Sequence, residues 1–265
     1  MTFGIFFVLG TISGSFFNVI IYRLPLEESI VKPRSHCPNC KKTIPFYRNI
    51  PILSFILQKG KCAECRKTIS LQYPAVELTN GLIWGWAFST MNIPDAVVSS
   101  LIISILITIA WIDAKLLMVP LDLIVAGIIV LITGAVGFNL FALNQILLGI
   151  VAGVFLPALI MGFTWLFTHR QGMGWGDLQL GLVLGAWLGP ICMIGTLFLA
   201  SFLGLIAWIC ISIVKGFDRN RPIPFAPYLV FSGVFIFVIT HQFPAFFDQL
   251  ILAEIITQNT YFVSR

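Results

Sequence analysis

The sequence predicts an all-α polytopic membrane protein, with about eight transmembrane helices and a four-cysteine zinc-knuckle insert on the cytoplasmic side. Three observations lead to this fold class. The 265 residues are 58% hydrophobic and only 10% charged, whereas a soluble domain carries about 25% charged residues. Apolar runs suited to crossing a bilayer follow one another along the chain. The cationic residues gather in alternate loops between these runs, as they do in membrane proteins of fixed orientation.

A transmembrane helix needs about 20 predominantly apolar residues, with a working range of about 17 to 25. Eight segments approach or reach this length: 3–22, 74–91, 96–112, 121–140, 145–168, 177–190, 191–214 and 227–242. Gly189 and Pro190 predict the break between the sixth and the seventh. The sixth is short and covers only about 21 Å at the rise of an α-helix. A residue at its start is therefore expected at or just inside the membrane edge.

The order of these segments divides the chain. Segment 3–22 has no basic residue before its apolar run, so we expect a retained span with its N-terminus outside, not a cleaved signal peptide. The predicted domains are a first transmembrane helix at 1–22, a cytoplasmic zinc-binding insert at 23–73, a transmembrane core at 74–242 and an extracytoplasmic tail at 243–265.

The charges predict the orientation. If eight spans alternate, 15 of the 16 Lys and Arg residues share one side and only Arg265 falls on the other. By the positive-inside rule, the shared side is cytoplasmic. The net charge of +5 therefore reflects topology, and we expect the lipid bilayer and no nucleic acid as a partner.

The insert carries two Cys-x2-Cys pairs, formed by Cys37, Cys40, Cys62 and Cys65. Two such pairs at this separation are a strong zinc signal, and a closed shell of four thiolates is structural because no position is left for water. The alternative is two disulfides, which a reducing cytoplasmic compartment disfavours. The basic residues around the pairs are either a solvated face or a site for anionic lipid heads. No internal repeat is evident.

Two aspartates are expected at the cytoplasmic membrane edge. Asp113 closes the third span, and Asp177 opens the sixth behind the glycine-rich stretch 172–176. An ionisable group at this depth is expensive and needs a reason. The alternative reading of Asp177 is a helix cap. Asp122 has the position of an ordinary helix-start carboxylate, and Glu77, near the start of the second span, either bonds to its neighbours or takes part in a site.

Two aspartates that lie close together cannot both ionise cheaply, so they share a proton. Aspartic proteases use such a pair of carboxyl groups: one activates water, and the other donates a proton. The pair titrates as a unit. The sequence itself places Asp113 and Asp177 only on the same side of the membrane.

The motifs extend this reading, because the chain resembles the type IV prepilin peptidases, membrane aspartic proteases of the GxGD class. Gly174-Trp175-Gly176-Asp177 matches the class signature, and Asp113 matches the first aspartate of the family. The resemblance covers nearly the whole chain, with further matching stretches at 14–19, 22–25, 35–40, 49–51, 60–62, 73–74, 76–78 and 224–228.

The resemblance implies a function. Such enzymes remove the leader peptide of prepilins and pseudopilins after a glycine, at the cytoplasmic face of the bacterial inner membrane. Many with a four-cysteine insert also methylate the new N-terminus with S-adenosylmethionine. By this resemblance the catalytic residues are Asp113 and Asp177, supported by Gly174 and Gly176, and the cofactors are a structural Zn²⁺ and S-adenosylmethionine.

Four positions depart from the family pattern. Gln179 stands where lysine is usual, Leu121 where aspartate is usual, Gln72 where arginine is usual, and Ala226 where glycine is usual. None of them removes a catalytic carboxylate, so they concern substrate binding and rate.

Three other functions fit parts of the sequence. A GxGD protease for other membrane substrates, such as preflagellins, fits the aspartates, but the preflagellin type lacks the cysteine insert. A proton-coupled transporter also uses membrane carboxylates, although transporter sites tend to lie near the midplane and between repeats. A non-catalytic, zinc-stapled assembly platform leaves both aspartates unexplained.

Overall fold

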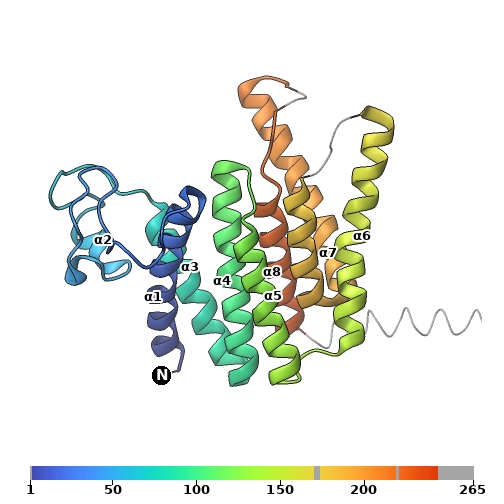
Figure 1. Cartoon of the computed structure of the whole chain (residues 1–265), viewed down its shortest axis with the longest axis horizontal. Coiled ribbons are helices and arrows are strands. Elements are labelled where there is room, and N and C mark those ends of the chain that lie inside the picture. The colour runs from blue at the N-terminus through green and yellow to red at the C-terminus, as the bar shows by residue number, and fades with distance from the viewer. Residues whose placement is uncertain (1, 170–173, 219–220, 244–265) are drawn as a thin grey trace, which may run out of the picture.

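The computed structural model of the chain is all-helical, as predicted, and describes residues 2–169, 174–218 and 221–243 (Figure 1). The long helices are α1 (Thr2–Arg23), α3 (Gln72–Thr90), α4 (Ile93–Leu116), α5 (Leu121–Ile132), α6 (Leu143–Thr168), α7 (Trp175–Lys215) and α8 (Ala226–Gln242). The short elements are η1 (Leu24–Leu26), η2 (Phe46–Arg48), α2 (Leu53–Leu57) and η3 (Thr133–Gly137). Most of the predicted tail, 244–265, lies outside the described residues, as does part of the glycine-rich stretch, 170–173.

The helices run up and down beside one another. In Figure 1, α1, α4 and α6 end at the upper edge of the view, where α3, α5, α7 and α8 begin. The insert between α1 and α3 lies beside these two helices, and α6 forms the opposite edge of the bundle. One end of the bundle therefore collects the termini that carry the candidate carboxylates.

Within the described part of the chain, four helices are long and apolar enough to cross a membrane: Thr2–Leu26, Ile93–Leu116, Leu143–Phe167 and Trp175–Lys215. The apolar helices Leu121–Gly137 and Ala226–Gln242 are shorter. Helix α4 is longer at both ends than its predicted segment, 96–112, so Asp113 lies inside its last turn.

Helix α7 is a helical hairpin. Its backbone leaves the helical conformation at Gly189, where φ is 77°. Glycine tolerates this φ, and Pro190 supplies no N–H to continue the hydrogen-bond ladder. Trp187 packs on Phe237 of α8 before the kink, and Gly195 faces Ile236 after it. The chain thus turns back on itself, and the predicted break at this position is confirmed.

Helix α6 packs against the first arm of α7 through glycines. Gly149 faces Gly185, and Gly153 faces Gly181, so a Cβ at any of the four would collide with the facing backbone carbonyl. Both helices therefore carry the small-xxx-small spacing that lets membrane helices approach closely.

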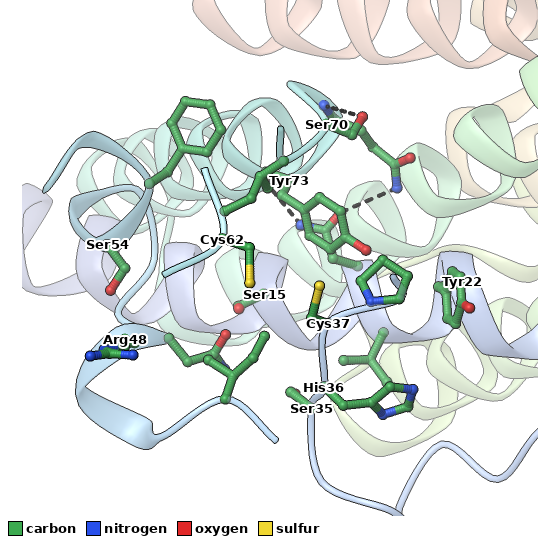
Figure 2. A pocket seen from close by; sticks show the side chains of 18 of the residues that line it. Ser15, Tyr22, Ser35, His36, Cys37, Arg48, Ser54, Cys62, Ser70 and Tyr73 are labelled. Carbon is green, nitrogen blue, oxygen red and sulfur yellow. Dashed lines mark hydrogen bonds between the residues drawn. The ribbon is translucent and has the colours of Figure 1, made fainter. Parts of the chain in front are cut away.

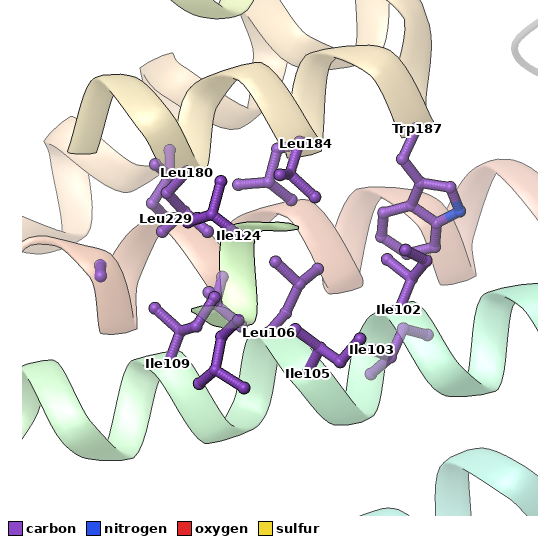
Figure 3. Packing of buried hydrophobic residues seen from close by; sticks show 14 of the residues in the cluster. Ile102, Ile103, Ile105, Leu106, Ile109, Ile124, Leu180, Leu184, Trp187 and Leu229 are labelled. Carbon is purple, nitrogen blue, oxygen red and sulfur yellow. The ribbon is translucent and has the colours of Figure 1, made fainter. Parts of the chain in front are cut away.

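The apolar core lies between α4, α7 and α8 (Figure 3). Ile102, Leu106 and Ile109 project from α4 and are fully buried. They meet Leu229 of α8 and Leu184 of α7 (Figure 3). This packing fixes the end of α4 relative to the start of α7.

The insert contains an internal repeat, so the expectation of none is wrong. Residues 37–44 and 62–69 share the pattern Cys-x2-Cys-basic-Lys-Thr-Ile. In each copy the first cysteine N–H donates to the carbonyl of the residue five positions later, and the residue after the second cysteine has positive φ. An isolated antiparallel bridge closes each copy. The repeat was readable in the sequence from the two flanking Lys-Thr-Ile tripeptides.

Candidate active site and metal centre

Asp113 lies in the last turn of α4 and is 6% exposed. Its Oδ2 accepts a hydrogen bond of 3.1 Å from the backbone N–H of Ala226, the first residue of α8. The helix ends at Leu116, and the next residue, Leu117, has a φ of 54° and donates its N–H to the Asp113 carbonyl. The side chain is thus held between the end of one helix and the start of another.

Asp177 lies in the first turn of α7. Its Oδ2 accepts a hydrogen bond of 3.1 Å from the N–H of Gly174, and its own N–H donates to the Gly174 carbonyl. Asp177 therefore also caps the start of α7, which was the alternative reading of this residue. A Cβ at Gly176 would meet Val119, so this glycine lets the start of α7 lie against the connection that follows α4.

The structure brings the two predicted carboxylates to the same end of the bundle, Asp113 in the last turn of α4 and Asp177 in the first turn of α7 (Figure 1). Each accepts a hydrogen bond from a backbone N–H on its Oδ2. A pair of carboxyls in this relationship can supply one base and one acid. The catalytic role of both residues stays a prediction.

A polar chain joins the end of α4 to α3 and α1. Lys115 donates a hydrogen bond to Gln72 Oε1, and Gln72 Nε2 donates to Asn18 Oδ1 at 3.3 Å. Asn18 Nδ2 in turn donates to the Tyr73 carbonyl at 3.0 Å. Lys115 was expected only as a loop charge, so this link was not predicted from the sequence. The available signal was its position two residues after Asp113.

Glu77 holds a strained turn of the insert. Its Oε2 accepts a 2.7 Å hydrogen bond from the N–H of Ile52, whose φ and ψ are 59° and −52°. A β-branched residue at positive φ is a genuine outlier, and such strain costs about 1–3 kcal/mol and persists where the surroundings enforce it. Of the two expectations for Glu77, bonding to neighbours is the one seen, and the residue is 8% exposed.

The four cysteines of the insert form one cluster. Their sulfurs all lie within 4.8 Å of one another, and the Sγ atoms of Cys37 and Cys65 are 3.9 Å apart. A tetrahedron with Zn–S bonds of about 2.3 Å has an edge of about 3.8 Å, so the cluster fits zinc. None of the four is in a disulfide. The cluster therefore has the donor set and spacing of a structural metal site.

Hydrogen bonds favour the thiolate at Cys65. The backbone N–H of Lys67 and the side-chain amide of Asn39 lower the pKa of this thiol to about 6. The two halves of the insert are also joined by Glu64, which pairs with Lys42 at 2.7 Å and Arg48 at 3.1 Å. The hydrogen bond from Lys42 lowers the pKa of Glu64. Both features stabilise charged groups in or beside the four-cysteine cluster.

A cavity of about 620 Å³ lies between the insert, α1, the start of α3 and the end of α4. Figure 2 shows Ser15 and Tyr22 of α1, Cys37 and Cys62 of the insert, and Tyr73 of α3 around this space. Lys115 and Leu116, which follow Asp113 on α4, also line it.

Comparisons with known proteins cover most of the chain. Residues 8–91 match the family described as Bacterial Peptidase A24 N-terminal domain, and residues 100–209 match the Type IV leader peptidase family. A prepilin leader peptidase/N-methyltransferase of Neisseria gonorrhoeae is 35% identical over 87% of this chain and 88% of its own. Proteins of the same name are 35% identical in Myxococcus xanthus, over 79% and 63%, and 30% identical in Bacillus subtilis, over 94% and 98%. No solved structure matches the chain significantly.

Proposed function

The chain belongs to the type IV leader peptidase family, and from this membership we propose that it removes the leader peptide from type IV prepilins and pseudopilins and then methylates the new N-terminus. The observation that carries the proposal is that Asp113, in the last turn of α4, and Asp177, in the first turn of α7, lie at the same end of the bundle. The matched relatives bear both activities in their names.

In the peptidase reaction, the ionised member of the pair takes a proton from water while the water oxygen attacks the peptide carbonyl. The protonated member donates its proton as charge develops on the carbonyl oxygen. Collapse of the tetrahedral adduct breaks the C–N bond. The diol returns a proton to the second aspartate, and the amine leaves with the proton that the first aspartate took from water. The backbone donors at Ala226 and Gly174 keep each carboxyl oriented during these transfers.

We propose that the bundle crosses the membrane eight times, with α7 counted as two spans. Alternation of the helix directions in Figure 1 and the kink at Gly189 support this count. With the N-terminus outside, the insert and both aspartates then lie on the cytoplasmic side of the bacterial inner membrane, where Lys and Arg are concentrated. A prepilin presents its leader at the same depth. The proposed domains are 1–22, 23–73, 74–242 and 243–265.

Zinc is the proposed metal of the insert, held by Cys37, Cys40, Cys62 and Cys65. The site has four sulfur donors, so a bound ion would have no open position and would act structurally. Its contribution is to fix the two halves of the repeat against each other. The peptidase step uses only the aspartates.

The test is direct. Purified protein in lipid nanodiscs is incubated with a prepilin and S-adenosylmethionine, and the mass of the product N-terminus is measured. We expect loss of the leader followed by a gain of one methyl group, and no cleavage by the Asp113→Asn variant. An intact prepilin with the native protein, under conditions where a family relative cleaves it, would refute the proposal.

A further inference from the structure

The insert has an apolar outer face. Five large apolar side chains between the two cysteine pairs are exposed, and none of them lines the cavity beside the insert: Phe46, Tyr47, Leu53, Ile56 and Leu57. Phe46 is 78% exposed and Leu57 is 72% exposed. Apolar side chains gathered in one short segment mark a surface that binds something other than water.

We propose that the segment 46–57 lies in the cytoplasmic leaflet of the bilayer, and that the basic residues around it contact anionic lipid head groups. The insert is then a part of the protein that is seated in the membrane surface. This inference goes beyond both proposed activities and rests only on the proposed crossing of the membrane by α1.

Contacts with α3 hold the segment at the depth of the membrane helices. The N–H of Ile52 donates to Glu77, which lies five residues, or about 7.5 Å, along α3 from its first residue. A Cβ on Gly14 of α1 would lie 2.8 Å from the Cα of Glu77. Gly14 comes nine residues, or about 13.5 Å, before the end of α1. The segment is therefore tied to a level well inside both helices.

Figure 1 shows the same depth. Helix α2, which belongs to the segment, lies level with the upper half of α1 and not above the end of the bundle. Since α1 is among the helices long enough to cross a membrane, an apolar segment at this level has lipid beside it. Interfacial segments bury their apolar face about 5–10 Å into the boundary between head groups and acyl chains.

The charges around the segment match anionic lipid. Residues 32–67 hold nine Lys or Arg residues and one carboxylate, Glu64. Two of the cations, Lys42 and Arg48, pair with this carboxylate. Lys59 and Lys61 follow the segment directly, and both are exposed. Cations next to an apolar segment are typical of interfacial protein segments, and the anionic cytoplasmic leaflet attracts them.

The aromatic residues also suit a membrane surface. The rings of Phe46 and Tyr47 pack edge to face, with their centroids 5.7 Å apart. The guanidinium of Arg48 lies 5.7 Å from the centroid of the Tyr47 ring. Tyrosine is enriched where membrane and water meet, because its ring is apolar and its hydroxyl is polar.

A second copy of the chain fits this face less well than lipid does. A symmetric contact would bring the cations of one insert against those of the other, and like charges across an interface are unfavourable. Water leaves the apolar side chains without a partner, which is also unfavourable. A bilayer surface with anionic head groups satisfies the apolar side chains and the cations together.

A first experiment measures the depth of the segment. An environment-sensitive fluorescent amino acid is introduced at Leu57, at Val8 or at Glu28 of the full-length chain. The chain is placed in nanodiscs of phosphatidylethanolamine and phosphatidylglycerol that contain a lipid with a nitroxide high on its acyl chain. We expect this lipid to quench the probe at Leu57 several-fold more than the probe at Glu28. Iodide in the water should quench them in the opposite order.

The controls separate the possible failures. Val8 is an exposed residue of α1, so its probe should be quenched by the lipid and not by iodide. Quenching of Val8 by iodide would refute the crossing of the membrane by α1 and this inference with it. Quenching of Leu57 by iodide, with Val8 in lipid, would overturn this inference alone. Shielding of Leu57 from both quenchers would mean that protein covers the face, and would also overturn it.

A second experiment tests the charge match. The probe at Leu57 is quenched with trace amounts of nitroxide-labelled phosphatidylglycerol or of equally labelled phosphatidylcholine. We expect the anionic lipid to quench at least about twofold more, because each cation near the surface attracts anionic lipid. The double variant Lys59→Gln, Lys61→Gln should lose much of this difference, whereas the control Lys215→Gln, at the end of α7, should retain it. Equal quenching by both lipids with the native insert would overturn the contact with anionic head groups.

Discussion

The carboxylate of Asp113 accepts a 3.1 Å hydrogen bond from the backbone N–H of Ala226, a residue 113 positions later in the chain. The bond ties the last turn of α4 to the first residue of α8, and both partners are buried. The bond uses only the backbone N–H, so alanine at position 226 supplies the same donor that glycine would supply.

Two substitutions at position 226 separate the effect of this hydrogen bond from the effect of the side chain. Ala226→Gly retains the donor and should keep cleavage near the native rate. Ala226→Pro removes it, and the loss of a hydrogen bond to a charged group, worth about 1.5–3 kcal/mol, should lower kcat by about tenfold or more. Cleavage kinetics and a thermal unfolding curve are measured together. Native kcat in a folded proline variant would show that the bond is dispensable.

The two aspartates should behave as one unit. Asp113→Asn, Asp177→Asn and the double variant should each abolish most leader cleavage, and the double variant should be little worse than either single one. The measurement is single-turnover cleavage of a prepilin at saturating enzyme. The control Asp122→Asn should cleave normally. Near-native cleavage by either single variant would exclude it from the pair.

Zinc binding should require the four clustered cysteines and no other cysteine of the chain. Cys37→Ser should lose zinc and methyl transfer, because binding free energy in such sites, about 10–16 kcal/mol in isolated peptides, is also folding free energy. Cleavage should fall less. Cys210→Ser, outside the cluster, should keep one zinc per chain. Metal analysis after purification without chelators decides the matter, and full methylation by metal-free protein would contradict a role for zinc.

The close approach of α6 and α7 should be sensitive to a single methyl group. Gly153→Ala places a Cβ against the Gly181 carbonyl, and such overpacking costs about 1–3 kcal/mol. Gly162→Ala on the same helix meets nothing within 4 Å and is the matched control. Thermal unfolding in detergent should show a lower midpoint only for Gly153→Ala. Equal midpoints would mean that the helices separate without cost.

Orientation can be read by labelling intact cells. Glu28 lies in the insert and Asn144 in the first turn of α6, and both are exposed. A membrane-impermeant thiol reagent added outside should label Asn144→Cys and miss Glu28→Cys, whereas both should react after permeabilisation. The reverse pattern would invert the proposed topology.

The parts predicted from sequence are those set by local chemistry. The lengths of the apolar runs predicted the helices, Gly189-Pro190 predicted the kink in α7, and the Cys-x2-Cys pairs predicted the cluster of sulfur atoms. The Asp113–Ala226 bond was beyond reach because it depends on how α4 packs against α8. The positive φ of Ile52 could not be predicted either, because isoleucine is among the residues least expected in that conformation. Its N–H donates to the buried Glu77, which is distant in the sequence.

The pairing of α1 with α3 has an evolutionary consequence. Gly10 and Gly14 bring the α1 backbone against α3, and Asn18 bonds to the Tyr73 carbonyl. The chain therefore leaves the bundle after Arg23 and returns at Gln72 beside the point of departure, held there by the helices themselves. The insert between these two residues can therefore be shortened, replaced or lost during evolution, because a short connection is enough to join α1 to α3. Cleavage and the chemistry of the insert can thus diverge along separate lineages without either aspartate changing its place.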